Sequence, residues 1–218
     1  MSLSQGHEVI AIPGPSPVPM RVLNAAHRAS PDIYAEPLAR LNEAVMAQLK
    51  RLVGTQAHLA PYIGNGHAGW EASAANLLDR GDCVLVVTCG HFGRSWADML
   101  AAMGLQVERL DFGNLPPDPD RIAARLVEDR QHRIRALMLC QIDTASATMA
   151  DIPAIRAAMG AHPAFLVVDA IASLGCVPMR MDEWGVDVLI AASQKGLMCP
   201  PGTSFVWFSD RAAARGPT

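Results

Sequence analysis

The chain has 218 residues, of which half are hydrophobic and 18% are charged, and this composition is typical of a globular rather than a disordered protein. Its 18 basic residues are slightly outnumbered by 21 acidic ones, and the net charge of −3 argues against binding to nucleic acids or membrane surfaces, which requires a positive surface. The only lysines are Lys50 and Lys195, and a lysine, unlike an arginine, can lose its proton and act as a nucleophilic amine.

The cysteine pattern and the absence of a targeting signal indicate the cellular compartment. The five cysteines are scattered, mostly in apolar runs, without a C-x-x-C pair, which favours buried reduced thiols over a zinc site or a redox dithiol. The first residues lack the charged and apolar regions of a signal peptide, and no apolar stretch reaches the roughly 18 residues of a membrane span. We therefore expect a soluble cytoplasmic protein.

Along the chain, a proline-rich arm is followed by a helix and then by alternating strands and helices. The first thirty residues predict an extended arm, and apolar positions at helical spacing in residues 35–53 predict a long amphipathic helix. Short β-rich runs indicate strands at residues 58–63, 83–88, 106–110, 135–140, 164–169, 186–191 and 203–208. Helices are expected at residues 68–78, 95–104, 119–130 and 152–160.

This alternation predicts an α/β fold, a doubly wound and mostly parallel sheet of about seven strands. The strands are nearly continuous in Val, Ile and Leu, as expected where helices cover both faces of a sheet. Open parallel sheets bind ligands beyond the carboxyl ends of their strands, so the residues that follow each strand are the candidates for chemistry. These residues are 64–67, 89–92, 141–144, 169–171 and 193–195.

A glycine-rich loop follows the first expected strand. Gly64, Gly66 and Gly69 form the G-x-G-x-x-G pattern of dinucleotide-binding domains. That assignment also needs an acidic residue at the end of the next strand, which here ends at Thr88. The loop still brings backbone N–H groups and a helix start together, so a phosphate group is favoured over a purely structural turn.

Two side chains at other strand ends suggest a specific cofactor. Lys195 lies among small and apolar residues, where desolvation favours the neutral amine that attacks carbonyl groups, although an ordinary surface lysine is the alternative. Asp169 ends an apolar strand, where a carboxylate needs a cationic partner unless it only caps the following segment. A phosphate loop, a nucleophilic lysine and a carboxylate suited to a protonated pyridine ring together indicate a pyridoxal phosphate site.

Several segments extend this indication to a family. The arm AIPGPSPVPMRVL, the loop GNGHAGWEA, the segment CGHFGRSWADM, the run LVVDAIASLG and the stretch DEWGVDVLIAASQKGLMCPPG lie between Pro13 and Asp210. Together they resemble class V aminotransferases, and most closely the alanine/serine–glyoxylate (serine–pyruvate) group. The resemblance implies the large domain of the fold-type I pyridoxal-phosphate transferases.

The resemblance also implies roles for individual residues. Lys195 would bind pyridoxal 5′-phosphate covalently and move a proton between the substrate and the cofactor, while Asp169 would keep the ring nitrogen protonated. Gly14 would border the substrate. The remaining cofactor-binding positions are Asn65, Gly66, His67 and Gln194 for the phosphate, Phe92 and Ile171 for the ring faces, and Thr144 near the ring hydroxyl.

Some of these residues have simpler interpretations. Phe92 is also consistent with a core position, and His67 with a contribution from its backbone N–H alone. Trp70 fits packing at a helix start as well as it fits ligand contact. No metal site is expected, because His91 has no second histidine at ligand spacing and the acidic cluster around Asp182 is typical of a solvated turn.

The chain departs from the family pattern in two places. The segment at residues 143–147 reads D-T-A-S-A where the family commonly has E-T/S-S-T-G, so Asp143 could alter substrate choice. The family also continues into a small C-terminal domain, whereas this chain ends at Thr218 soon after its last expected strand. We therefore expect an arm at residues 1–34 and a cofactor-binding large domain at residues 35–218 without that second domain. The interpretation of the chain as a fragment of a longer protein is favoured over a natural remnant. An exposed apolar edge is expected where the second domain would pack.

The resemblance implies transamination between a small amino acid, of alanine or serine type, and a small 2-oxo acid such as glyoxylate or pyruvate. It also implies a homodimer with a shared active site. Another class V reaction, such as pyridoxamine–pyruvate transamination or a lyase reaction, is the nearest alternative. A non-catalytic remnant or a dinucleotide-binding domain is the alternative of a different class.

Overall fold

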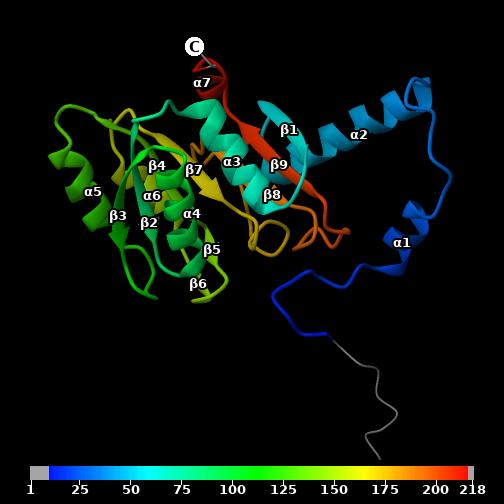
Figure 1. The fold of residues 1–218 in the computed structure, drawn as a ribbon, viewed down its shortest axis with the longest axis horizontal. Coiled ribbons are helices and arrows are strands. Elements are labelled where there is room, and N and C mark those ends of the chain that lie inside the picture. Colours follow the sequence, from blue (N-terminus) through cyan, green and yellow to red (C-terminus); the bar gives the residue numbers. More distant parts are fainter. Residues whose placement is uncertain (1–9, 216–218) are drawn as a thin grey trace, which may run out of the picture.

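The computed structural model describes residues 10–215, and a seven-stranded sheet forms its centre (Figure 1). Across the sheet the strand order is β1-β9-β8-β7-β4-β2-β3. The strands are β1 (His58–Ile63), β2 (Cys83–Thr88), β3 (Gln106–Asp111), β4 (Ile134–Cys140), β7 (Phe165–Asp169), β8 (Val188–Ala192) and β9 (Thr203–Phe208). Two short strands, β5 (Ile142–Asp143) and β6 (Thr148–Met149), form a separate hairpin.

The sheet is mostly parallel, as predicted. Strands β3, β2, β4, β7 and β8 run parallel to their neighbours. Strand β9 is antiparallel to β8, and β1 is antiparallel to β9, so β1 points the same way as the parallel strands. Every residue of β2 and of β8 is buried, because helices cover both faces of the sheet.

Two groups of helices cover the two faces. The helices α3 (Gly66–Leu77) and α4 (His91–Ala102), with the short α7 (Asp210–Ala213), pack on one face around Trp70, Trp96 and Val86. The helices α5 (Pro119–Glu128) and α6 (Ile152–Ala158) pack on the other face through residues such as Ile122 and Ile155. Consecutive strand residues alternate between the two cores, as the geometry of a strand requires.

Every predicted strand and helix is present, with bounds shifted by at most four residues, whereas β5, β6 and α7 (Asp210–Ala213) were not predicted. Helix α3 begins at Gly66 and α4 at His91, two and four residues earlier than the sequence pattern indicates. The prediction of an extended arm is wrong for α1 (Met20–Ala26), a two-turn helix without a buried residue. All five cysteines are free, but Cys176 is exposed, so burial was wrongly expected there.

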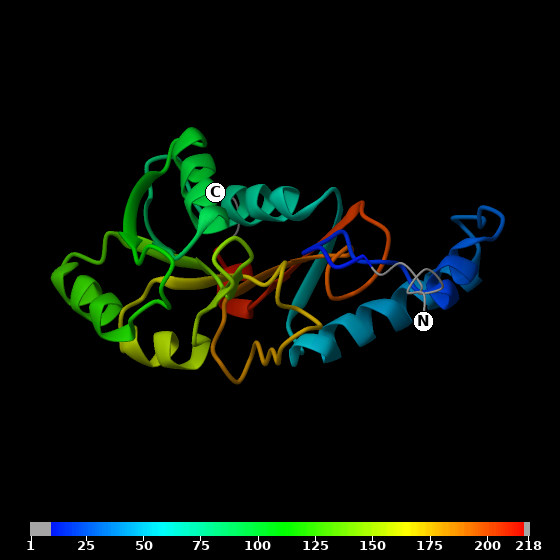
Figure 2. The same cartoon turned by 90° about the horizontal axis from the view of Figure 1, so that it is seen from below.

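Helix α2 (Glu36–Val53) runs out from the side of the sheet toward α1 (Figures 1 and 2). Of its residues only Val53 is buried. Apolar side chains along it, including Leu41, Val45 and Leu52, are 40–43% exposed. The amphipathic stripe predicted from the sequence is therefore present, and the rest of the described chain leaves most of it uncovered.

Candidate active site

A pocket of about 200 Å³ lies where β1, β2, β7 and β8 end, at the carboxyl edge of the sheet. The structure brings together all nine residues that the sequence assigned to cofactor binding. The pocket is lined by Asn65, Gly66, His67, Phe92, Thr144, Asp169, Ile171, Gln194 and Lys195, and also by Trp70, Ile142 and Ala172, which the sequence reasoning did not assign. The chemistry-bearing residues are thus neighbours in space.

The glycine loop forms the start of α3. Asn65 caps the helix, because its side-chain oxygen accepts the N–H groups of His67 at 3.0 Å and Ala68 at 3.4 Å. Gly66 is buried, and a Cβ atom there would lie 2.3 Å from Cδ1 of Ile171, so any larger residue would displace the Ile171 side chain. The loop places the positive end of a twelve-residue helix at the pocket, where an anion is stabilised.

His67 makes two contacts within the chain. Its backbone N–H is donated to Asn65, and its ring packs edge-on against Trp70, with 4.6 Å between the ring centroids. Trp70 in turn stacks on Trp96 at 5.4 Å. The contacting rings of His67, Trp70 and Trp96 connect the pocket side of α3 to α4.

Asp169 is a buried carboxylate with several hydrogen-bond donors. It is the last residue of β7 and is 4% exposed. Its oxygens accept the N–H of Ile171 at 2.6 Å, the indole N–H of Trp70 at 2.9 Å and the thiol of Cys140 at 3.5 Å. Burial raises the pKa of Asp169 to about 6, although the hydrogen bonds from Ile171, Trp70 and Cys140 oppose the shift. A cation beside it would stabilise the ionised form.

The raised pKa of Asp169 predicts a pH dependence of stability. Between 3.8 and about 6 the folded carboxyl keeps its proton while the unfolded one has lost it, so the free energy of unfolding falls as pH rises through this range. The pKa difference corresponds to about 3 kcal/mol. Chemical denaturation of ligand-free wild type and Asp169→Asn at pH 4 and pH 7 should therefore show the variant gaining stability relative to wild type at the higher pH.

Comparing wild type with Asp169→Asn removes the contributions of other titrating groups to the pH dependence of stability. Asp111, through its hydrogen bond from Thr88, has a lowered pKa and contributes stability that is lost as pH falls, but it is present in both proteins. A difference between the two proteins that does not change with pH would contradict the raised pKa of Asp169.

Lys195 lies at the pocket under the N-terminal arm. Its Nζ donates to the carbonyl oxygen of Pro13 at 2.9 Å. Ser16 fastens the arm to the same loop, because its N–H donates to the carbonyl oxygen of Gln194 at 2.8 Å and its hydroxyl donates to that of Lys195 at 2.9 Å. At Gly14, whose φ is +127°, a Cβ atom would lie 2.9 Å from Nζ. The structure thus places Gly14 directly beside the amine.

The side chain of Gln194 has a polar atom without a hydrogen-bond partner among the described residues. Its Oε1 atom is buried and has no hydrogen-bond partner within residues 10–215. Buried polar atoms are normally paired, so this oxygen is available to accept a hydrogen bond from a donor group of a ligand. Phe92 and Thr144 are both half-buried and line the same pocket from α4 and from the turn after β5.

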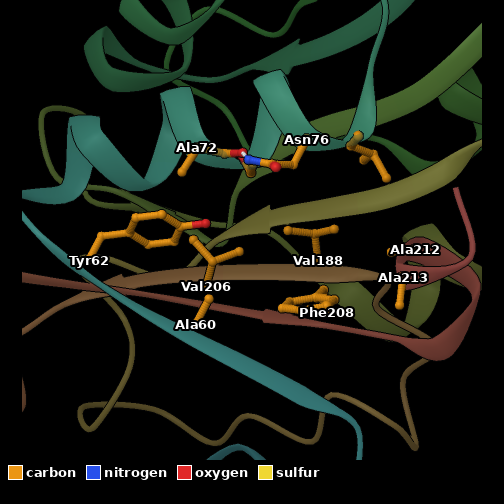
Figure 3. Close-up of a pocket in the computed structure, with 11 residues that line it drawn as sticks. Ala60, Tyr62, Ala72, Asn76, Val188, Val206, Phe208, Ala212 and Ala213 are labelled. Atoms are coloured by element: carbon orange, nitrogen blue, oxygen red, sulfur yellow. Dashed lines mark hydrogen bonds between the residues drawn. The ribbon is translucent and has the colours of Figure 1, made fainter. Parts of the chain in front are cut away.

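A second hollow of about 190 Å³ lies between α3 and the β1-β9-β8 end of the sheet (Figure 3). Its lining is mostly apolar, with residues such as Val206 and Phe208, and Tyr62 and Asn76 are its larger polar side chains. The lining contains no carboxylate, lysine, arginine or histidine. Of these two pockets, only the first therefore has side chains for acid–base or nucleophilic chemistry. Within residues 10–215 there is no group of three or more His, Cys, Asp or Glu residues able to hold a metal, and no helix long and apolar enough to cross a membrane.

The family of the chain follows from comparison with known proteins. The model of the family "Aminotransferase class-V" matches residues 13–217. The chain belongs to the class V aminotransferases. This family uses pyridoxal phosphate, which accounts for a pocket that combines a lysine, a buried carboxylate and a phosphate-type loop. The fold-type I large domain expected from the sequence is also confirmed.

Several of the similar proteins carry the names of glyoxylate aminotransferases. An L-aspartate–glyoxylate aminotransferase of Paracoccus denitrificans is 36% identical over 93% of this chain and 52% of that protein. A serine–glyoxylate aminotransferase of Methylorubrum extorquens is 35% identical over 97% of this chain and 54% of that protein. The structure of an alanine–glyoxylate aminotransferase from Nostoc sp. superimposes with a TM-score of 0.87, at 27% identity over 97% of this chain and 58% of that chain. The chain thus spans about half the length of the curated relatives.

Proposed function

We propose that this class V chain takes part in pyridoxal-phosphate-dependent transamination between a small amino acid, of alanine or serine type, and a small 2-oxo acid such as glyoxylate or pyruvate. The observation that carries the proposal is the meeting of Lys195, the buried Asp169 and the N-terminus of α3 in one pocket. The names of the relatives support the substrate classes, and their pairing with glyoxylate favours this acceptor.

The lining of the pocket fits the cofactor group by group. Asn65, Gly66 and His67, at the helix N-terminus, would hold the phosphate, together with Gln194, whose side-chain NH2 group can donate to it. The faces of the ring would contact Phe92 and Ile171, and Thr144 would lie near the ring hydroxyl. A Cβ atom at Gly66 would displace Ile171, one of the two side chains proposed to contact the ring.

The chemistry divides between two side chains. When bound, pyridoxal phosphate withdraws electrons from the substrate's α-carbon. Asp169 would hold the proton on the ring nitrogen, because burial disfavours its charged form unless a cation lies beside it. Lys195 would take the proton from the substrate's α-carbon and return it on the cofactor side. The carbonyl oxygen of Pro13, which accepts from Nζ, would orient the amine.

We also propose that the protein works as a homodimer with a shared active site. The exposed apolar side chains of α2, such as Leu41 and Val45, support an association surface on this helix.

We further propose a cytoplasmic location. The five free cysteines support it, because thiols stay reduced in the cytoplasm.

Spectroscopy of the purified protein tests the proposal. Pyridoxal phosphate should give the protein a visible absorbance band, and borohydride should fix the cofactor irreversibly to Lys195. Because the chain has only one other lysine, Lys50, peptide mapping provides its own control. Adding alanine or serine, but not glyoxylate, should convert the band to that of the aminated cofactor.

The same assay decides the amino donor. Aspartate belongs in the panel, because one relative carries the name L-aspartate–glyoxylate aminotransferase. If aspartate alone converted the band, the donor part of the proposal would be wrong while the reaction class would stand. A well-folded full-length protein that acquires no band, or is labelled at Lys50, would refute the proposal.

A further inference from the structure

A second carboxylate, Asp143, is fully buried next to the pocket. It ends β5 and is 0% exposed, and its neighbours Ile142 and Thr144 both line the pocket. Its oxygens are held by backbone N–H groups, since Oδ2 accepts from Gly93 at 2.9 Å and Oδ1 accepts from Ala145 at 3.1 Å. The carboxylate thus joins the turn after β5 to helix α4.

The bond from Gly93 acts as the cap of α4. A helix usually begins with a side chain that accepts an N–H group from its first turn. At α4 that position is Gly90, which has no side chain to do so. Asp143, 50 residues further along the chain, supplies the oxygen instead, at the positive end of the helix.

Gly90 provides the space for this carboxylate. A Cβ atom at residue 90 would lie 2.3 Å from both Cγ and Oδ1 of Asp143. The φ angle of Gly90 is −178°, which any residue adopts, so the backbone conformation does not require glycine. The requirement comes from the close approach of Asp143, and the two residues form one unit.

This unit connects two walls of the pocket. Phe92 lies in the α4 turn between Gly90 and Gly93, and Thr144 directly follows Asp143. We propose that Asp143 is a positioning residue that sets the spacing between Phe92 and Thr144 around the bound cofactor, and that Gly90 is required for this role. The inference rests on the proposed function, because it concerns the affinity of the same pocket for pyridoxal phosphate.

The outer side of the same turn is anchored independently. The guanidinium of Arg94 donates to Asp111 at 3.1 Å and to the carbonyl oxygen of Gly113 at 2.8 Å. Because these bonds do not involve Asp143, the turn keeps an attachment to the sheet edge when Asp143 is changed. Loss of the Asp143 bonds should therefore loosen the pocket wall without unfolding the domain.

The first test is the affinity of Asp143→Asn for pyridoxal phosphate, measured by quenching of tryptophan fluorescence in the full-length protein. Asparagine offers one acceptor oxygen where aspartate offers two, so one N–H group loses its partner, and we expect about tenfold weaker binding. Asp151→Asn is the matched control, because Asp151 caps α6 by accepting the N–H of Ala154 at 3.0 Å, on the opposite face of the sheet. Because asparagine caps a helix about as well as aspartate, this variant should change the Tm little and leave the Kd for the cofactor unchanged.

A second variant approaches the unit from the other side. Gly90→Ala displaces the carboxylate without removing it, and should also weaken binding about tenfold. In a protein that already carries Asp143→Ala, Gly90→Ala should weaken cofactor binding little further, because the carboxylate that the new methyl group would meet is gone. Gly90→Ala also gives an independent result should Asp143→Asn fail to fold.

Three results would overturn the inference. They are a wild-type Kd in Asp143→Asn, equal weakening in Asp143→Asn and Asp151→Asn, and fully additive effects of the changes at residues 90 and 143. A wild-type protein that binds no pyridoxal phosphate refutes the proposed function itself. A wild type that binds while Asp143→Asn binds equally well refutes only the role of Asp143.

Discussion

Replacing Lys195 with arginine is expected to abolish transamination. Arginine keeps the positive charge but cannot lose its proton, so it can neither bind the cofactor covalently nor accept the proton of the substrate's α-carbon. Proton transfer by a positioned side chain alone contributes about 10²–10⁴-fold to a rate, and the loss in kcat should be at least that large. Steady-state assays with alanine or serine and glyoxylate measure it.

The second lysine of the chain offers a matched control. Lys50→Arg makes the same chemical change on α2, away from the lining of the pocket, and should leave kcat near the wild-type value. Lys195→Ala should be as inactive as Lys195→Arg, because both lack a neutral amine. Normal turnover in either Lys195 variant would show that another group performs the proton transfer.

Replacing Asp169 with asparagine should leave a protein that binds the cofactor but turns over slowly. The amide is nearly the same size and still accepts a hydrogen bond, but it carries no charge to hold a proton on the ring nitrogen. Removing one electrostatic contribution of this kind costs about 10²–10³-fold in kcat. Parallel measurement of cofactor affinity and kcat distinguishes this loss from a failure to bind.

A charge-preserving change at the same position completes the test. Asp169→Glu retains a carboxylate but crowds a site that is 4% exposed, so it should recover part of the lost rate while binding the cofactor less tightly. A nearly normal rate in Asp169→Asn would contradict the role of the buried charge.

The strands were predictable from the sequence because their signal is local. The apolar runs at residues 83–88 and 186–191 correspond to β2 and, within two residues, to β8, whose residues are all buried, since helices on both faces demand continuous apolar residues. The start of α4 was not predictable, because its first turn contains Gly93 and its cap comes from Asp143, far away in the sequence. Helix α1 was missed because proline-rich flanks dominated the interpretation of the arm.

The site was predictable to the extent that strand ends mark it. Asp169, Lys195 and the glycine loop were expected at one edge of the sheet and meet there, because Asp169 ends β7 while Lys195 and the loop lie just beyond the ends of β8 and β1. The hydrogen bonds to Asp169 from Trp70 and Cys140 were not visible in the sequence. A signal for Trp70 did exist, since it lies four residues after Gly66 and therefore shares one face of α3 with it.

The pairing of β1 with β9 has a consequence for the order of synthesis. Strand β1 hydrogen-bonds to β9 alone within the sheet, although more than 130 residues separate the two in the chain, as the pairing of Ala60 with Val206 illustrates. On the ribosome, β1 therefore has no partner strand until β9 has emerged. During that interval Leu59 and Tyr62 of β1 lack the completed cores against which they pack. A nascent chain of this topology therefore depends more on protection from aggregation than a chain whose first strand pairs with its neighbour in sequence.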